Sequence, residues 1–131
     1  MKLKLLAVVF AVLPLNAMAV NWVEISDTEE ASLYLDTDSP FIDDGNVLVW
    51  TLGNLKKDLG AGTYSFRALW QIDCDRKRMR VLQMPTYEAP MGQGRPNPSS
   101  SSESTAWEYP IPGSTNASIQ LLMCLWKSNQ K

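Results

Sequence analysis

Apolar and polar residues alternate most clearly over residues 63–73. Every second position on one side is apolar, and the series ends in a cysteine: Tyr64, Phe66, Ala68, Trp70, Ile72 and Cys74. The positions between them are mostly polar: Ser65, Arg67, Leu69, Gln71 and Asp73. Side chains two residues apart on a strand point to the same face. The pattern therefore predicts a strand with one buried face, as in an antiparallel sheet, with Cys74 projecting from the apolar side.

Shorter patterns of the same kind predict further strands at 21–26, 32–35, 47–55 and 77–84, and a short last strand at 107–109. Segment 47–55 is apolar on both of its sides, which suits a central strand with both faces at least partly covered. Asp75-Arg76 marks a tight turn between the strands at 63–73 and 77–84.

Two segments have the composition of turns and loops. Segment 36–46 combines acidic residues with Ser39-Pro40 and Gly45-Asn46. Segment 87–104 contains prolines, glycines and a run of serines, which predicts a long flexible loop, with a short strand near Met91 as an option. Such a loop is equally consistent with a binding loop and with a solvated spacer.

The C-terminal segment 114–127 fits two structures. As a helix it would begin at a cap on Ser114 or Thr115, and it would place Leu121, Cys124 and Leu125 on one face. A buried strand over 119–125 fits nearly as well. The length of the segment and the Pro-Gly-Ser before it favour the helix. On that interpretation Cys124 faces inward beside Leu121 and meets Cys74 on the apolar face of the strand at 63–73.

The N-terminus has the features of a secretory signal peptide over residues 1–19. Lys2 and Lys4 supply positive charge, residues 5–15 are apolar, and Ala17-Met18-Ala19 predicts cleavage after Ala19. The apolar run is shorter than a stable membrane span, although a membrane anchor is the alternative. No cysteine lies near the cleavage site, so we expect no bacterial lipid attachment. Residues 20–131 then have the size of one domain.

Charge and cysteine content narrow the class of protein. Removal of Lys2 and Lys4 takes the formal net charge from −2 to −4, which argues against nucleic-acid binding because that needs a basic surface. Two cysteines in an exported protein predict a disulfide between Cys74 and Cys124. Two free thiols or an intermolecular bond are the alternatives.

The chain contains no histidine. This removes the commonest general base, the Ser-His and Cys-His nucleophile pairs and the commonest metal ligand. If both cysteines are oxidised, thiolate catalysis and a zinc site lose their ligands as well. Acidic pairs such as Asp73 with Asp75, or Asp43 with Asp44, could act on sugars, but neighbours in sequence usually mark solvated turns. We therefore expect no enzyme activity, no cofactor and no metal site.

Two features indicate binding. Arg76, Lys77, Arg78 and Arg80 form a basic cluster that would contact an acidic partner, or else form a charged turn with a solvated strand face. The chain also contains five tryptophans. The alternation predicts that Trp70 lies in the core, together with Trp50. The remaining tryptophans fit either core packing or an exposed partner anchor: Trp22, Trp107 and Trp126.

The order of several short motifs resembles a known family. These motifs are residues 21–26 and 34–39, Gly45-Asn46-Val47 with Trp50, Tyr64-Ser65, Asp73-Cys74, Met91-Gly92, Trp107, residues 111–114 and Cys124. Together they resemble the surface-adhesin protein E family of Gram-negative bacteria, over nearly all of residues 20–127. The resemblance implies an α+β fold, mainly β: a curved antiparallel sheet of about six strands, with a C-terminal helix on its concave face tethered by one disulfide.

The resemblance also implies a function. The founding adhesin is a surface lipoprotein that engages host plasma and matrix proteins, whereas this chain has no lipidation cysteine. We expect an exported, non-lipidated and non-enzymatic binding module, in the periplasm, at the cell surface or secreted. Its expected partners are host extracellular proteins or polyanions. A soluble periplasmic accessory protein that binds a protein partner or a small ligand, with no adhesive role, is the alternative.

Overall fold

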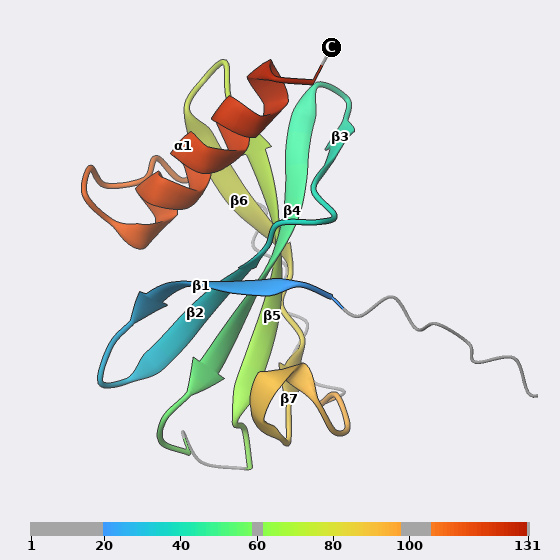
Figure 1. Ribbon diagram of the computed structural model, residues 1–131, viewed down its shortest axis with the longest axis vertical. Helices are drawn as coiled ribbons and strands as arrows, with labels where there is room; N and C mark the ends of the chain where they lie inside the picture. The colour runs from blue at the N-terminus through green and yellow to red at the C-terminus, as the bar shows by residue number, and fades with distance from the viewer. Residues whose placement is uncertain (1–19, 59–61, 98–105, 131) are drawn as a thin grey trace, which may run out of the picture.

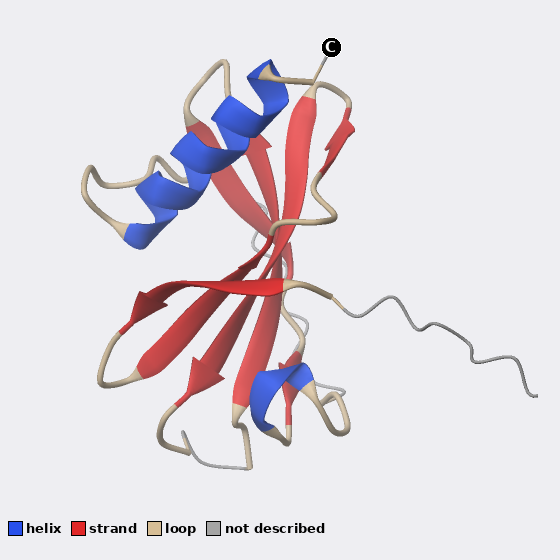
Figure 2. Ribbon diagram, in the orientation of Figure 1, coloured by secondary structure: helices blue, strands red, loops and turns tan. Residues whose placement is uncertain are grey.

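The computed structural model describes residues 20–58, 62–97 and 106–130. Within them, the chain forms a twisted seven-stranded antiparallel sheet with a C-terminal helix packed on one face (Figures 1 and 2). The strands are β1 (Trp22–Asp27), β2 (Ala31–Asp36), β3 (Phe41–Asp43), β4 (Asn46–Leu55), β5 (Ser65–Asp73), β6 (Arg78–Gln83) and β7 (Thr86–Tyr87). Their order in the sheet is β1-β2-β4-β5-β6, and β3 pairs with β4 while β7 pairs with β5. The predicted fold class is confirmed.

Two short strands were not predicted from the sequence. Strand β3 lies in the segment that was expected to be a turn. All three of its residues are exposed, and so short a strand with no buried side gives no alternation of apolar and polar residues in the sequence. Asp44 and Gly45 have positive φ angles of 48° and 78° between the paired residues Asp43 and Asn46. This is the backbone of a two-residue hairpin turn, which joins β3 to β4. Strand β7 has only two residues.

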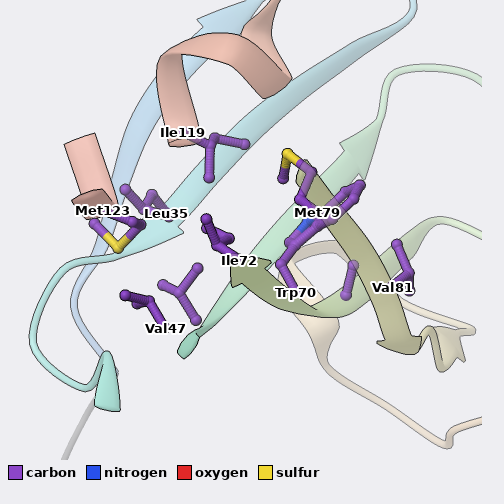
Figure 3. Packing of buried hydrophobic residues seen from close by; sticks show 10 residues of the cluster. Leu35, Val47, Trp70, Ile72, Met79, Val81, Ile119 and Met123 are labelled. Carbon is purple, nitrogen blue, oxygen red and sulfur yellow. The ribbon is translucent and has the colours of Figure 1, made fainter. Parts of the chain in front are cut away.

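The core lies between the sheet and the helix, where the alternation in β5 places it. Ala68, Trp70 and Ile72 of β5 are buried there, and the Nε1–H of Trp70 donates to the hydroxyl oxygen of Thr51 at 3.0 Å. Figure 3 shows the surrounding cluster, which joins side chains of four strands to the helix: Leu35, Val47, Val49, Ala68, Trp70, Ile72, Met79, Val81, Ile119 and Met123.

Helix α1 (Thr115–Ser128) forms, rather than the alternative strand. The hydroxyl oxygen of Ser114 accepts a hydrogen bond from the backbone N–H of Ala117 at 3.2 Å, so Ser114, and not Thr115, is the N-cap. The helix face was predicted wrongly. Ile119 and Met123 point into the core, whereas Leu121 is 62% exposed and therefore does not lie on the buried face. Apolar residues occur all around this helix, so periodicity alone did not select the buried side.

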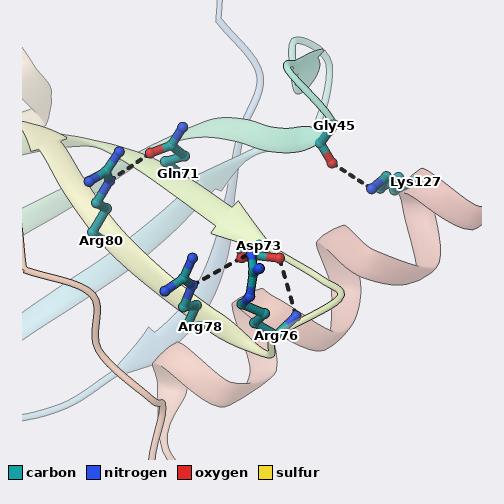
Figure 4. A network of polar contacts seen from close by, with 7 residues as sticks. All are labelled: Gly45, Gln71, Asp73, Arg76, Arg78, Arg80 and Lys127. Carbon is teal, nitrogen blue, oxygen red and sulfur yellow. Dashed lines mark hydrogen bonds and ion pairs between the residues drawn. The ribbon is translucent and has the colours of Figure 1, made fainter.

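The predicted disulfide joins Cys74, directly after β5, to Cys124 of α1, with their Cα atoms 5.7 Å apart. It lies at the margin of the core, where both cysteines pack against the buried cluster. Near the end of the helix, Lys127 Nζ donates to the carbonyl oxygen of Gly45 at 2.5 Å (Figure 4). The helix is thus connected to the β5 end by a covalent bond and to the β3–β4 turn by a hydrogen bond.

Residues 84–97, which follow β6, contact the sheet. A 3₁₀ turn, η1 (Pro90–Gly92), stands where a short strand near Met91 was an option. The Ser65 hydroxyl donates to the carbonyl oxygen of Ala89 at 2.6 Å and accepts from the N–H of Gly92 at 2.8 Å. The N–H of Met91 donates to Asn54 Oδ1 at 2.9 Å. The expected flexible loop is therefore a packed turn here, and its residues 98–104 lie outside the described residues.

The expected short strand at 107–109 is a single bridge, in which Glu108 and Met79 exchange backbone hydrogen bonds of 2.8 and 2.9 Å. The predicted signal peptide, residues 1–19, lies outside the described residues. Across the three described ranges, no helix has the length and hydrophobicity that a bilayer span requires.

We predict that reduction of the disulfide lowers the free energy of unfolding by about 4 kcal/mol, because the bond closes a loop of about 50 residues. Urea denaturation with and without a reductant measures this difference. The double variant Cys74→Ser with Cys124→Ser is the control, and its unfolding should not respond to the reductant. Equal stability of the oxidised and reduced protein would contradict the prediction.

Candidate functional site

The structure divides the predicted basic cluster between two environments. Arg76 and Lys77 lie in the turn between β5 and β6, where both are exposed. Arg78 and Arg80 lie on β6, on the sheet face that points away from α1. The four side chains are close in space, but they do not form one continuous stripe of free charge.

Asp73, a buried residue at the end of β5, organises the turn (Figure 4). Its carboxylate oxygen Oδ2 lies 3.0 Å from Arg78 Nε and 3.6 Å from Arg76 Nη1. Its Oδ1 accepts from the backbone N–H of Arg76 at 3.2 Å. Burial alone would raise the pKa of Asp73, but the Arg76 N–H and the Arg78 guanidinium outweigh it and hold the pKa below its usual value of 3.8.

Trp107 holds the two strand arginines. The guanidinium carbon atoms of Arg78 and Arg80 lie 4.2 and 4.3 Å from the centre of its ring, which is within the range of a cation–π contact. Arg80 Nε also donates to Gln71 Oε1 at 2.6 Å. These contacts position Arg78 and Arg80 within the fold, so the cations that face solvent are Arg76 and Lys77.

A shallow depression adjoins this turn. It has a volume of ≈ 260 Å³ and is lined by Lys77, Leu121, Gln120 and the two cysteines of the disulfide. Gln120 Nε2 is buried there without a hydrogen-bond partner among the described residues. A basic turn and an apolar depression thus share one end of the molecule.

A second region lies on the sheet face opposite α1, and it was not predicted. It is a half-open cleft of ≈ 440 Å³. Its walls come from β1, β2, β4, β5 and the segment from the end of β6 to β7, together with residues that flank β1 and β2: Val20, Trp22, Asp36, Ser39, Trp50, Arg67, Gln83, Pro85 and Tyr87. Trp50 lies here and not beside Trp70 in the core. Adjacent residues on a strand face opposite sides, and Val49, which pairs with Trp70, takes the core side of β4.

Arg67 is the central cation of this cleft. Its guanidinium carbon lies 5.7 Å from the ring centre of Trp22 and 5.2 Å from that of Tyr87. Its Nη2 donates to the carbonyl oxygen of Gly92 at 3.2 Å. A Cβ atom on Gly92 would lie 2.5 Å from Arg67 Nε, so only glycine lets the turn approach the arginine this closely.

Two features of the sequence point to the cleft. Arg67 is a cation on the mostly polar side of the strand at 63–73, and of the five tryptophans only Trp70 is buried in the core. Because the lining residues come from five separate segments, only the strand pairing shows that they meet.

The acidic pairs considered for sugar hydrolysis have other roles. Asp73 is engaged by the two arginines, and Asp43 and Asp44 form part of the β3–β4 hairpin. Within the described parts of the chain, no group of three or more acidic or cysteine side chains could hold a metal ion.

Comparison with known proteins identifies the family. The family model of surface-adhesin protein E matches residues 22–125. The chain belongs to this family. None of the curated proteins compared with it matches significantly.

Solved structures of Haemophilus influenzae protein E have the same fold. Crystal form II aligns with a TM-score of 0.64 at 16% sequence identity, covering 82% of this chain and 99% of that chain. A structure of protein E from non-typeable Haemophilus influenzae aligns with a TM-score of 0.55 at 15% identity, covering 84% and 88% of the two chains. At such identities the similarity establishes a protein E fold. The disulfide is consistent with export of this family member.

We predict that Asp73→Asn lowers the free energy of unfolding near neutral pH by about 1–3 kcal/mol, because charge-assisted hydrogen bonds to the two arginines are lost. The lowered pKa sets the sign of the pH dependence. The contribution of Asp73 is complete above pH 3.8 and is lost as the pH falls through the lowered folded-state value.

Urea denaturation at about pH 7 and about pH 2.5 tests both points. The stability difference between wild type and Asp73→Asn should shrink at the lower pH. Asp75→Asn, which removes an exposed acid from the same turn, is the matched control. A constant difference at both pH values would show that the Asp73 carboxylate does not carry this stabilisation.

Proposed function

We propose that this protein is an exported, non-enzymatic binding protein that attaches to an acidic region of an extracellular host protein. The contact surface is the β5–β6 turn with the depression beside it, defined by Arg76, Lys77, the disulfide and Leu121. The observation that carries this proposal is the position of two exposed cations next to exposed apolar surface at one rigid end of the fold.

Charge supports an acidic partner. Residues 73–80 contain four cationic and two acidic side chains, which leaves the turn positive on a protein that is acidic as a whole. The Arg76 side chain is 70% exposed, whereas that of Arg78 is 22% exposed. A local positive field on an acidic protein directs a negatively charged partner to this end.

Rigidity supports binding through this turn. The Asp73 carboxylate holds the Arg76 backbone, and Cys74, two residues before Arg76, is bonded to the helix. A turn fixed in this way loses little conformational entropy when a partner binds. The apolar depression adds contact area that a purely ionic site lacks, which favours a protein partner over a simple polyanion.

We predict that Arg76→Ala with Lys77→Ala weakens retention on immobilised host plasma and matrix proteins by about two- to thirtyfold at low salt. This corresponds to roughly 0.2–1 kcal/mol for each exposed charge. High salt should reduce the difference, since exposed charges are screened. Surface plasmon resonance over a salt series measures the effect.

The matched control is Lys57→Ala with Arg95→Ala, which removes one lysine and one arginine from exposed positions elsewhere. This control should bind as wild type does. An equal loss in both double variants would assign the effect to net charge and not to the turn. Absence of wild-type retention on every surface at low salt would reject the adhesive function.

The adhesive function also requires display outside the cell. We predict that protease added to intact Gram-negative cells degrades a tagged copy, or that the copy is found in the medium. Protection until the outer membrane is permeabilised would support the periplasmic accessory role in place of adhesion. A periplasmic protein that is known to be sealed in the same cells is the control for leakage.

A further inference from the structure

The cleft around Arg67 is separate from the β5–β6 turn, and the function proposed above makes no use of it. It lies on the opposite sheet face from α1, between β1 and the turn η1 that follows β7. Its lining combines three aromatic rings with one cation, one anion and two neutral polar side chains. Such a mixture of apolar surface and a few placed polar groups is typical of small-molecule sites.

Arg67 is held by the fold without being neutralised by it. Across the described residues, no carboxylate forms an ion pair with its guanidinium, which contacts the Trp22 and Tyr87 rings and donates one hydrogen bond, to Gly92. Its Nε is buried without a partner in the same part of the chain. An arginine has five N–H donors in a planar fork that matches a carboxylate. The terminal donors that remain are therefore suited to a ligand carboxylate.

The charge balance of the cleft favours a ligand with a single acid group. Asp36 is only 3% exposed, and its carboxylate accepts from the Asp38 N–H at 3.1 Å and from the Ser39 hydroxyl. Asp36 thus places one negative charge at the wall of the cleft. A polyphosphate or a densely sulfated chain would meet this carboxylate, whereas one acid group can pair with Arg67 alone.

The remaining surface favours a ring bearing hydroxyl groups. Trp22, Trp50 and Tyr87 offer flat apolar faces, and Ser39 and Gln83 offer hydrogen-bonding groups between them. A pyranose presents C–H groups on its faces and hydroxyls around its edge, so it can use both kinds of surface. The volume of ≈ 440 Å³ lies in the lower part of the range for ligand pockets.

We propose that this cleft binds a sugar acid, with the ring against the tryptophans and the carboxylate on the guanidinium of Arg67. Hexuronic and nonulosonic acids share this chemistry. Recognition depends on the acid group, so the neutral sugar of the same ring shape binds much more weakly.

NMR titration of the whole mature protein tests the site. The probes are methyl glucuronide, a hexuronic acid derivative, and N-acetylneuraminic acid, a nonulosonic acid. The control is methyl glucoside, in which a hydroxymethyl group replaces the carboxylate of methyl glucuronide. Each of the five tryptophans has one indole N–H, which serves as the reporter. The signals of Trp22 and Trp50 should shift saturably with at least one of the two acids, whereas those of Trp70, Trp107 and Trp126 should not.

Arg67→Gln should weaken binding of that acid by roughly 10- to 100-fold, the range for loss of a charge-assisted hydrogen bond. Arg67→Lys keeps the positive charge but loses the planar guanidinium, so its affinity for the acid should lie between those of wild type and Arg67→Gln. Arg95→Gln, an equal charge change on an exposed loop residue, should bind as wild type does. If Arg67→Gln does not fold, the comparison of methyl glucuronide with methyl glucoside on the wild type still decides the question.

Three outcomes would overturn the proposal: no saturable shift with either acid, equal binding of methyl glucoside, or shifts confined to Trp107 or Trp126. None of these outcomes depends on the β5–β6 turn. Failure of the sugar-acid site and failure of the adhesive function are therefore distinguished by separate experiments.

Discussion

Strand β5 lies between β4 and β6, and the alternation of its side chains organises both faces of the sheet. Ala68, Trp70 and Ile72 point toward α1 and form the middle of the core. Polar residues of β5 point the other way, and four of them contact different parts of the molecule. Ser65 binds the turn η1, Arg67 lies in the cleft, Gln71 binds Arg80, and Asp73 holds the β5–β6 turn.

This division explains why polar residues on β5 are buried. Ser65 is fully buried and Asp73 nearly so, although the simple one-sided pattern predicts a solvated face. The turn η1 covers one end of that face, and Trp107 with its two arginines covers the other. Buried polar groups are tolerated where hydrogen bonds replace those to water, and Ser65 and Asp73 both have such partners.

The disulfide connects the core to the proposed binding end. It joins the residue after β5 to the helix, so the bond that stabilises the helix against the sheet also fixes the start of the β5–β6 turn. Stability and the geometry of the basic turn are therefore linked. The cleft around Arg67 depends instead on strand pairing and on η1. The two candidate sites are therefore held in place by different interactions.

The sequence alone determined the features that depend on local period and composition. These are the five longer strands, the buried face of β5, a helix cap at Ser114 or Thr115, the pairing of the only two cysteines and the family. It did not determine which side of α1 is buried. Leu121 and Ile119 are both large apolar residues on different sides of the helix, and only packing against the sheet selects between them. Nor did the sequence place Trp50, whose strand is apolar on both sides. The cleft required the tertiary structure entirely, since Trp22, Arg67 and Tyr87 meet only when β1, β5 and β7 are assembled, and contacts between distant segments leave no periodic signal along the chain.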